Sequence, residues 1–399
     1  MVQKKSDCRM NEIRTRDAFD AAHGKLRWTA AKGLDLSNVG LAGWKRAAIE
    51  QTYFLGCAFK NRAVVDYLLD RGAVLLTRFP ATAYNPFRAE LYTPEELEES
   101  VAPRTTRDRA IYKEYLAKGQ FSPDVIEALT RRIHDDSIDD ALERLVAQKG
   151  ALKVAGFVGG SAVERGDEWY RKTAETARLV ARDGNFVMTG GGPGMMEAAN
   201  LGAYFSARHF GESDLEAAID ILAAAPEYEH PEWRQRAAEV KERFPRGAAS
   251  LGVPTWFYGR EPTNSFATHV AKYFDNSIRE GGLLMLSLAG VVVAPGSAGT
   301  LQEIFMDAEQ NYYATSGYHS PMVFLGVRQW EMDTPVFSLV KQTANEICRN
   351  MLFISDFPAE IAELLTASGI AGPVSEIDLW GGACCSWGPV PELFWSECR

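Results

Sequence analysis

The chain has 399 residues, 46% of them hydrophobic, and its 43 basic residues against 53 acidic residues give a formal charge of −10. This size allows a large core and predicts two or three domains. The acidic balance, with no long basic run or basic–aromatic ladder, disfavours nucleic-acid binding.

The remaining composition favours a reduced, cytoplasmic protein. The six cysteines show no CxxC spacing and the six histidines form no HExxH-type pair, so we expect no metal site. The first residues are polar and the apolar runs have the length of strands. We therefore predict neither a secretory leader nor contact with a membrane.

Residues 1–150 are predicted to form an N-terminal α/β accessory region. Residues 73–77 have the pattern of a strand, Thr93 and Pro94 begin one helix, and Ser122 begins another. The charged stretch 135–148 predicts a solvated helix. Residues 35–38 faintly suggest a five-residue β repeat, which we discount because no period is sustained.

From residue 151 strands and helices alternate. Apolar, β-branched runs predict strands near 154–158, 186–188, 290–294 and 321–325, with helices between them. Fully apolar strands indicate a parallel sheet covered on both faces, so the predicted class is α/β, a Rossmann-like doubly wound fold. We place this domain at 151–345, with a helical insertion near 211–250 and a C-terminal helix and irregular tail at 346–399.

Two glycine-rich loops stand where strands should pass into helices. One runs from Gly190 through Gly191, Gly192 and Gly194 to Met195; the other contains Gly296, Ser297, Ala298, Gly299 and Thr300. Gly160 and Ser161 follow an earlier strand. Glycine lets a backbone approach a ligand closely, and a helix start presents free N–H groups to an anion. In parallel sheets ligands bind at the carboxyl ends of the strands, so these loops predict a nucleotide or sugar-phosphate site.

Three polar residues near the loops could contact the ligand, but each also has a purely structural explanation. Glu303 lies one turn into the helix that follows the second loop, but with Thr300 it also fits a capping box. Arg279 could reach the ligand or form a surface pair with Asp275. Asn264 could contact a base or sugar or belong to a turn.

These elements together resemble the Lonely Guy (LOG) family, formerly described as lysine decarboxylase-like. The resemblance is carried by Gly159-Gly160-Ser161, Gly190 to Met195, Arg279 and Pro295-Gly296-x-x-Gly299-Thr300-x-x-Glu303 over about residues 152–330. The Glu261-Pro262-x-Asn264 element is more similar to the larger bacterial nucleotide nucleosidases of this group. The resemblance implies a nucleoside 5′-monophosphate phosphoribohydrolase, a hydrolase that needs no cofactor, with Glu303 and Arg279 as catalytic residues. It also implies a homodimer or higher homo-oligomer.

Two departures from the family pattern support a second hypothesis. Ser297 stands at the second glycine of PGGxGTxxE, and Glu280 follows Arg279 where the family commonly has lysine. A nucleotide-binding or cofactor-carrier protein could use the same cradle without cleaving its ligand. An NAD-dependent oxidoreductase is disfavoured because no GxGxxG fingerprint with a downstream acid is in register.

Overall fold

The computed structural model describes residues 11–76, 79, 81–259 and 262–367. They belong to two compact units, which divide between residues 78 and 79. None of the helices in these ranges combines the length and the apolar content that crossing a membrane requires.

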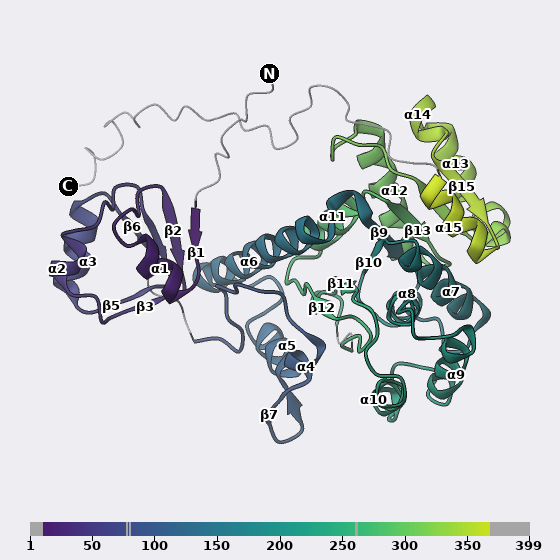
Figure 1. The fold of residues 1–399 in the computed structure, drawn as a ribbon, viewed down its shortest axis with the longest axis horizontal. Helices are drawn as coiled ribbons and strands as arrows, with labels where there is room; N and C mark the ends of the chain where they lie inside the picture. Colours follow the sequence, from purple (N-terminus) through teal and green to yellow (C-terminus); the bar gives the residue numbers. More distant parts are fainter. Residues whose placement is uncertain (1–10, 77–78, 80, 260–261, 368–399) are drawn as a thin grey trace. The chain divides into compact units, whose positions relative to one another are not determined.

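The smaller unit is built on a four-stranded parallel sheet with short helices between its strands (Figure 1). Its elements are β1 (Asn11–Ile13), α1 (Arg16–Ala22), β2 (Thr29–Lys32), β3 (Asp35–Leu36), α2 (Leu41–Trp44), β4 (Tyr53–Leu55), β5 (Ala58–Phe59), α3 (Arg62–Asp70) and β6 (Val74–Leu76). The sheet order is β1-β2-β4-β6, and β3 pairs with β5. The register joins Asn11 to Thr29, Ala30 to Tyr53 and Tyr53 to Val74. The unit therefore contains a repeat of strand and helix, with a longer period than the five residues considered from the sequence.

The larger unit is built on a seven-stranded sheet of order β12-β11-β10-β9-β13-β14-β15, and every pair in it is parallel. The strands are β9 (Val154–Val158), β10 (Phe186–Thr189), β11 (Leu251–Gly252), β12 (His269–Val270), β13 (Gly290–Val293), β14 (Met322–Leu325) and β15 (Leu352–Ser355). The α/β class and the doubly wound parallel sheet are thus confirmed.

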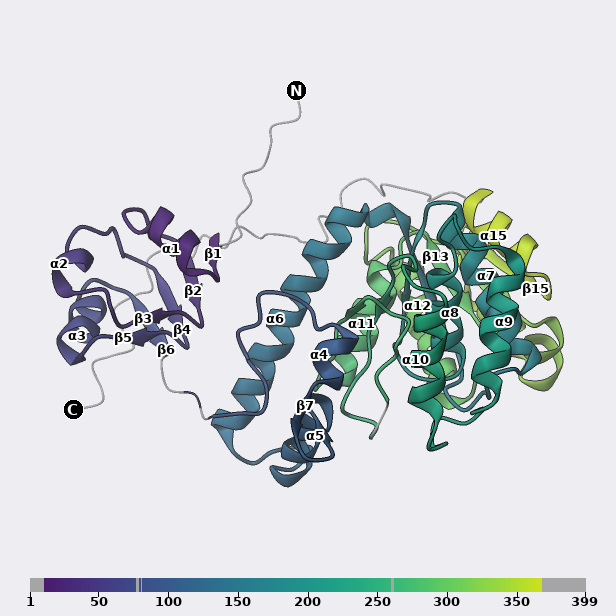
Figure 2. The ribbon, with the colours of Figure 1, turned by 60° about the horizontal axis from the view of Figure 1, so that its bottom comes forward.

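Helices cover both faces of this sheet, as Figures 1 and 2 show. Residues of β9 alternate between two cores: Val154 and Val158 join one core, while Ala155 and Phe157 join the other. The first core includes residues of α6, α11, α12 and α13, and the second includes residues of α7, α8 and α15. These helices are α6 (Val125–Lys149), α7 (Glu168–Arg182), α8 (Met195–Tyr204), α11 (Asn276–Leu286), α12 (Ala298–Tyr313), α13 (Val336–Thr343) and α15 (Pro358–Ala367).

Two further groups of helices complete the unit. The predicted helical insertion forms α9 (Glu212–Ala223) and α10 (Trp233–Arg243), which pack on each other. Before the sheet come α4 (Pro94–Glu98), α5 (Arg107–Ala117) and the short antiparallel pair β7 (Ser100–Ala102) and β8 (Thr105–Thr106). Short helical segments η1 (Ala151–Lys153), η2 (Gln329–Asp333) and α14 (Glu346–Arg349) connect other elements.

Helix α6 explains why the larger unit begins near residue 79 rather than 151. Its charged sequence predicts a solvated helix over 135–148, but it is longer and much of it is buried. Leu142 and Val146 join the main core, and the Asp135 carboxylate accepts hydrogen bonds from the backbone N–H groups of Phe274 (3.0 Å) and Asp275 (2.9 Å). The Asp135 side chain thus binds the backbone that leads into α11. Charged residues on this helix therefore include buried ones that make tertiary contacts.

The order of crossovers places the switch point of the sheet beside β9. From β9 the chain moves one strand at a time through β10 and β11 to β12, and then returns to β13 on the other side of β9. In sheets of this kind ligands bind beyond the carboxyl ends of the strands at the switch point, which here is where the chain leaves β9 and β13.

Candidate functional site

Three loops meet at the carboxyl ends of the adjacent strands β10, β9 and β13. The Gly160 N–H donates to the Pro295 carbonyl at 2.9 Å, and the Met195 N–H donates to the Gly160 carbonyl at 3.0 Å. The loop after β9 is therefore held between the two predicted glycine loops. The structure brings all three predicted segments together at the switch point.

Glycine is required where these backbones touch. Gly194 has φ +68°, a left-handed conformation, and a Cβ there would lie 2.4 Å from the Gly160 carbonyl oxygen. A Cβ on Gly296 would collide with the Thr300 side chain and lie 2.9 Å from the Gly160 nitrogen. The glycines thus serve the packing of the loops, whichever ligand lies above them.

The second loop leaves the N-terminus of α12 open. Helix α12 begins at Ala298 with Ser297 as its N-cap, and no side chain caps its first turn in the described chain. Ser297, Ala298 and Gly299 are exposed, while Thr300 is buried under Gly296. The first N–H groups of an uncapped helix lack partners within the helix, so they remain free to bind an anion.

This helix start excludes the capping-box alternative for Glu303. With Ser297 at the N-cap, Thr300 is the third helical residue and Glu303 lies in the body of α12. The Glu303 side chain is buried, with 8% of its surface exposed, and its Oε1 lies 3.6 Å from Nη1 of Arg279. The acid and the guanidinium therefore lie on the same side of the sheet.

Arg279 is also not a surface residue paired with Asp275, which was the alternative considered from the sequence. Asp275 instead caps α11 and pairs with Arg132 at 2.7 Å. The buried Arg279 guanidinium donates from Nε to the Val253 carbonyl (2.6 Å) and from Nη2 to the Gly190 carbonyl (2.9 Å). Arg279 thus joins the end of β11, the first glycine loop and Glu303.

Glu280 supplies a second carboxylate at this cluster. It is 2% exposed, its Oε1 lies 3.5 Å from Nη1 of Arg279, and its Oε2 accepts a hydrogen bond from Nε2 of Gln302 at 2.5 Å. One buried guanidinium therefore faces the carboxylates of both Glu280 and Glu303. Two carboxylates beside one buried cation can stabilise a ligand or transition state that carries positive charge.

Asn264 lies beneath the site and its side chain binds protein groups. Its Nδ2 donates to Oδ1 of Asn200 at 2.9 Å, and its Oδ1 accepts from the Phe266 N–H at 3.0 Å. Asn200 also accepts from the Thr189 hydroxyl at 2.7 Å, at the end of β10. This buried network supports the first glycine loop from below, and we assign Asn264 no ligand contact.

Sequence reasoning missed a buried ion pair beside the first loop. Nε and Nη2 of Arg165 donate to the two carboxylate oxygens of Glu197 at 2.8 and 2.5 Å, and the Tyr170 hydroxyl donates to the same carboxylate at 3.1 Å. Burial, and then the Glu197 charge, raises the pKa of Tyr170 well above its usual value, so Tyr170 stays a neutral donor. The available signal was Glu197 itself, an acid in the first turn of the helix that follows the glycine loop.

Two cavities lie near the cluster, and none of Arg279, Glu280 and Glu303 lines either one. One, of about 240 Å³, is bordered by Ser161, Pro193 and Gly194 and by residues of the 226–233 segment. The other, of about 550 Å³, is bordered by Gln302, Asn276 and aromatic residues that include Phe257 and Phe274. The first is bordered by both the β9 loop and the first glycine loop, and the second reaches the site through Gln302.

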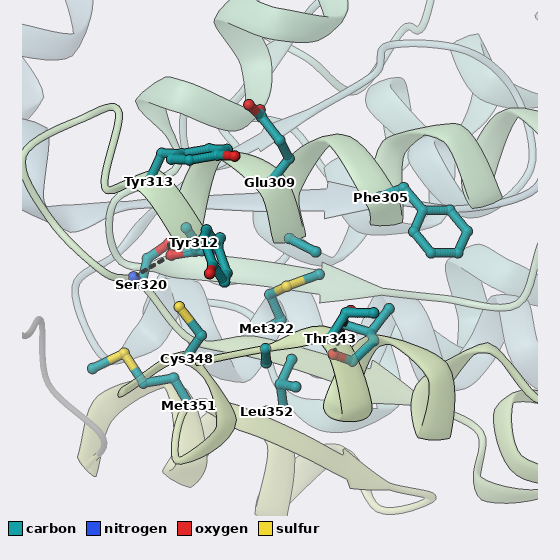
Figure 3. A pocket seen from close by; sticks show the side chains of 14 residues that line it. Phe305, Glu309, Tyr312, Tyr313, Ser320, Met322, Thr343, Cys348, Met351 and Leu352 are labelled. Atoms are coloured by element: carbon teal, nitrogen blue, oxygen red, sulfur yellow. Dashed lines mark hydrogen bonds between the residues drawn. The ribbon is translucent and has the colours of Figure 1, made fainter. Parts of the chain in front are cut away.

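A third cavity, of about 310 Å³, lies along α12 and is mainly apolar. Figure 3 shows Phe305, Tyr312, Met322 and Cys348 around it. Glu303 is not among the residues that line it. Its chemistry suits apolar contacts rather than a phosphate, so we do not place the ligand there.

Comparisons with known proteins include a distant structural likeness. No protein-family model and no curated protein matches the chain. Among solved structures it is similar to the molybdenum cofactor binding protein from the phototrophic bacterium Rippkaea orientalis, at 14% sequence identity and a TM-score of 0.33. The match covers 54% of this chain and 96% of that chain. At this similarity it carries no functional argument, and the resemblance to the Lonely Guy family rests on the motifs alone.

Proposed function

We propose that this chain hydrolyses the N-glycosidic bond of a nucleoside 5′-monophosphate and releases a free base and ribose 5-phosphate. The observation that carries the proposal is the convergence of Arg279 and Glu303, 3.6 Å apart, beside three loops that meet at the switch point of the sheet. This arrangement offers an acid, a cation and free backbone amides at one place. The motif resemblance to phosphoribohydrolases adds independent support.

The 5′-phosphate binds at the start of α12. The exposed residues 297–299 present backbone N–H groups that no side chain of the described chain caps, and the helix dipole adds to their attraction for an anion. Ser297 contributes a hydroxyl where the family pattern has glycine. The phosphate thereby fixes the sugar within reach of the next turn of the helix, which carries Glu303.

Cleavage replaces the bond between C1′ and the base nitrogen with a bond between C1′ and a water oxygen. The Glu303 carboxylate orients that water and stabilises the oxocarbenium-like charge that develops on the sugar. Arg279 holds Glu303 and the first glycine loop in place. The base leaves with the electron pair of the broken bond and gains a proton, while the attacking water loses one.

The substitution Glu303→Gln tests this role. We expect nucleotide binding within a few fold of wild type, because the fold and the phosphate cradle stay, and a loss of turnover of roughly 10²–10⁴-fold, as for removal of a general base or electrostatic group. Release of free base from a panel of nucleoside monophosphates is measured by chromatography, and binding by calorimetry. Glu309→Gln, an exposed acid on the same helix, is the matched control. Wild-type turnover in Glu303→Gln would falsify the assignment.

Nucleotide binding without cleavage is the second candidate, and the position of Glu280 favours it. Because Glu280 lies 3.5 Å from the same Arg279 nitrogen that faces Glu303, it competes for the guanidinium. The nucleotide panel separates the two functions: tight binding with no free base supports the carrier. If Glu280→Lys, which restores the residue common in the family, then gains turnover, Glu280 is the cause.

We also propose that the chain is a cytoplasmic homodimer or higher homo-oligomer. The resemblance implies pairing through helices beside the site, and α12 exposes large aromatic side chains, with 44% of Phe305 and 61% of Tyr313 accessible. Such a surface favours association. Light scattering after size-exclusion chromatography tests this proposal, and a monomer at micromolar concentration contradicts it.

A further inference from the structure

The 240 Å³ cavity differs in origin from the rest of the site. One side is formed by Ser161 of the loop after β9 and Gly194 of the first glycine loop, and the other by the segment that joins α9 to α10. That segment belongs to the helical insertion, which lies outside the motifs that carry the family resemblance. The residues of the insertion that line the cavity are Pro226, Glu227, Tyr228, Glu229 and Trp233.

The floor of this cavity is rigid and its charge is balanced. Nη1 of Arg165 donates to the Trp233 carbonyl at 2.8 Å, its other two nitrogens bind Glu197, and its guanidinium stacks over the Trp233 ring at 4.0 Å. All three nitrogens of the guanidinium are therefore engaged within the protein. Arg165 holds the insertion against the first glycine loop and leaves no free cation at the floor.

The rim of the cavity, by contrast, carries unbalanced negative charge. Glu164, Glu227 and Glu229 are exposed, and none of the three pairs with a cation in the described part of the chain. Carboxylates accept hydrogen bonds and repel phosphate. A bound nucleotide therefore cannot place its phosphate here, and the free amides of α12 hold that end instead.

Tyr228 gives the same rim a flat apolar surface. It keeps 42% of its surface exposed, next to Pro226 and Pro193. Aromatic rings stack on nucleobases with any sequence, so stacking fixes a base without choosing it. The carboxylates can discriminate between bases, because Glu and Asp accept hydrogen bonds from amino groups such as the N4 amino group of cytosine.

We propose that this cavity binds the base of the nucleotide and that Glu227 and Glu229 select bases with an exocyclic amino group. The inference rests on the proposed function for its substrate class, a nucleoside 5′-monophosphate. Cytosine and guanine present amino groups to a carboxylate. Uracil has a carbonyl oxygen in place of the cytosine amino group and would bring it close to a negative charge, whereas hypoxanthine has a C–H in place of the guanine amino group and loses the hydrogen bond. Wild-type protein therefore prefers CMP over UMP, and GMP over IMP, by roughly tenfold or more, the discrimination of one good hydrogen-bonded pair.

The test measures both affinity and base release for CMP, UMP, GMP and IMP. The double substitution Glu227→Gln/Glu229→Gln keeps the size of both side chains but lets each one donate as well as accept. We expect the CMP/UMP and GMP/IMP ratios to fall to within about threefold of one, since the loss of about 1 kcal/mol of discrimination is about fivefold. Glu242→Gln, an exposed acid on α10 that does not line the cavity, is the control and keeps the wild-type ratios.

The two readouts separate the inference from the function beneath it. Base release without preference for amino bases overturns the base cavity and leaves the hydrolase intact. Binding that prefers CMP and GMP, with no base released by wild type, supports the cavity and overturns the hydrolase. If the double variant keeps the wild-type ratios, Glu227 and Glu229 do not read the base.

Discussion

Asp307 lies one turn beyond Glu303 on the buried face of α12 and should make the protein less stable as the pH rises. The carboxyl is 2% exposed, and its Oδ2 has no hydrogen-bond partner in the described structure. Burial raises the pKa of Asp307 from 3.8 to about 8. The folded protein therefore keeps this group protonated at neutral pH, while the unfolded chain ionises it.

The sign and size follow from proton linkage. Between the unfolded pKa and the folded pKa, the folded state binds one proton more, so the free energy of unfolding falls by about 1.4 kcal/mol per pH unit. From pH 5 to pH 7 this group therefore lowers the free energy of unfolding by roughly 3 kcal/mol, and the decrease levels off above pH 8. Below pH 3.8 the group contributes no pH dependence.

Asp307→Asn removes this slope, because the amide has the same shape and does not titrate. Urea unfolding of both proteins at pH 5, 6 and 7 gives the difference in free energy of unfolding at each pH. We expect the variant to gain on the wild type by about 3 kcal/mol between pH 5 and pH 7. Any constant cost of the new amide cancels in this comparison, and Asp307→Leu should show the same relative gain. Parallel pH profiles for wild type and both variants would refute the buried neutral acid.

The substitution Arg279→Met removes the buried guanidinium that both Glu280 and Glu303 face. Because it breaks buried ion pairs, we expect it to lower the free energy of unfolding by about 3–5 kcal/mol, measured by urea denaturation. A loss below about 1 kcal/mol would show that these pairs do not stabilise the fold. Gly194→Ala forces a Cβ against the Gly160 carbonyl and into a left-handed backbone, and should lower the thermal midpoint. Gly299→Ala, where a Cβ meets nothing within 4 Å, should leave the midpoint unchanged or raise it, because alanine favours the helix. Equal shifts for the two glycines would contradict the packing of the loops.

The fold class could be predicted because buried parallel strands appear in the sequence as uninterrupted apolar runs. Residues 154–158 and 290–293 form adjacent strands of the sheet, and each is followed by a loop of small residues. The convergence of Arg279 and Glu303 could be expected in the same way. Each lies near the start of a helix that follows a parallel strand, α11 after β12 and α12 after β13, so both helices begin at the carboxyl edge of the sheet. Their roles in catalysis remain predictions.

Long-range partners could not be predicted from the sequence. Asn264 contacts Asn200, which is 64 positions earlier in the chain, and no local pattern pairs them. The composition of helix α6 predicts exposure to solvent. Asp135 is nevertheless buried, and its carboxylate accepts hydrogen bonds from the backbone N–H groups of residues 139 and 140 positions later. In both cases a polar side chain is buried by a partner that only the tertiary fold provides, and composition cannot distinguish such a residue from a solvated one.

The helical insertion enters after α8 and leaves before β11, so the strand order of the sheet does not depend on its length or sequence. Arg165 connects the insertion to the first glycine loop. Its hydrogen bonds go to the Glu197 carboxylate and to the main-chain carbonyl of Trp233, and not to the side chains at the rim. Selection can therefore exchange the rim residues without disturbing the acid and guanidinium near α12. Related chains could diversify in what they recognise while keeping one reaction centre.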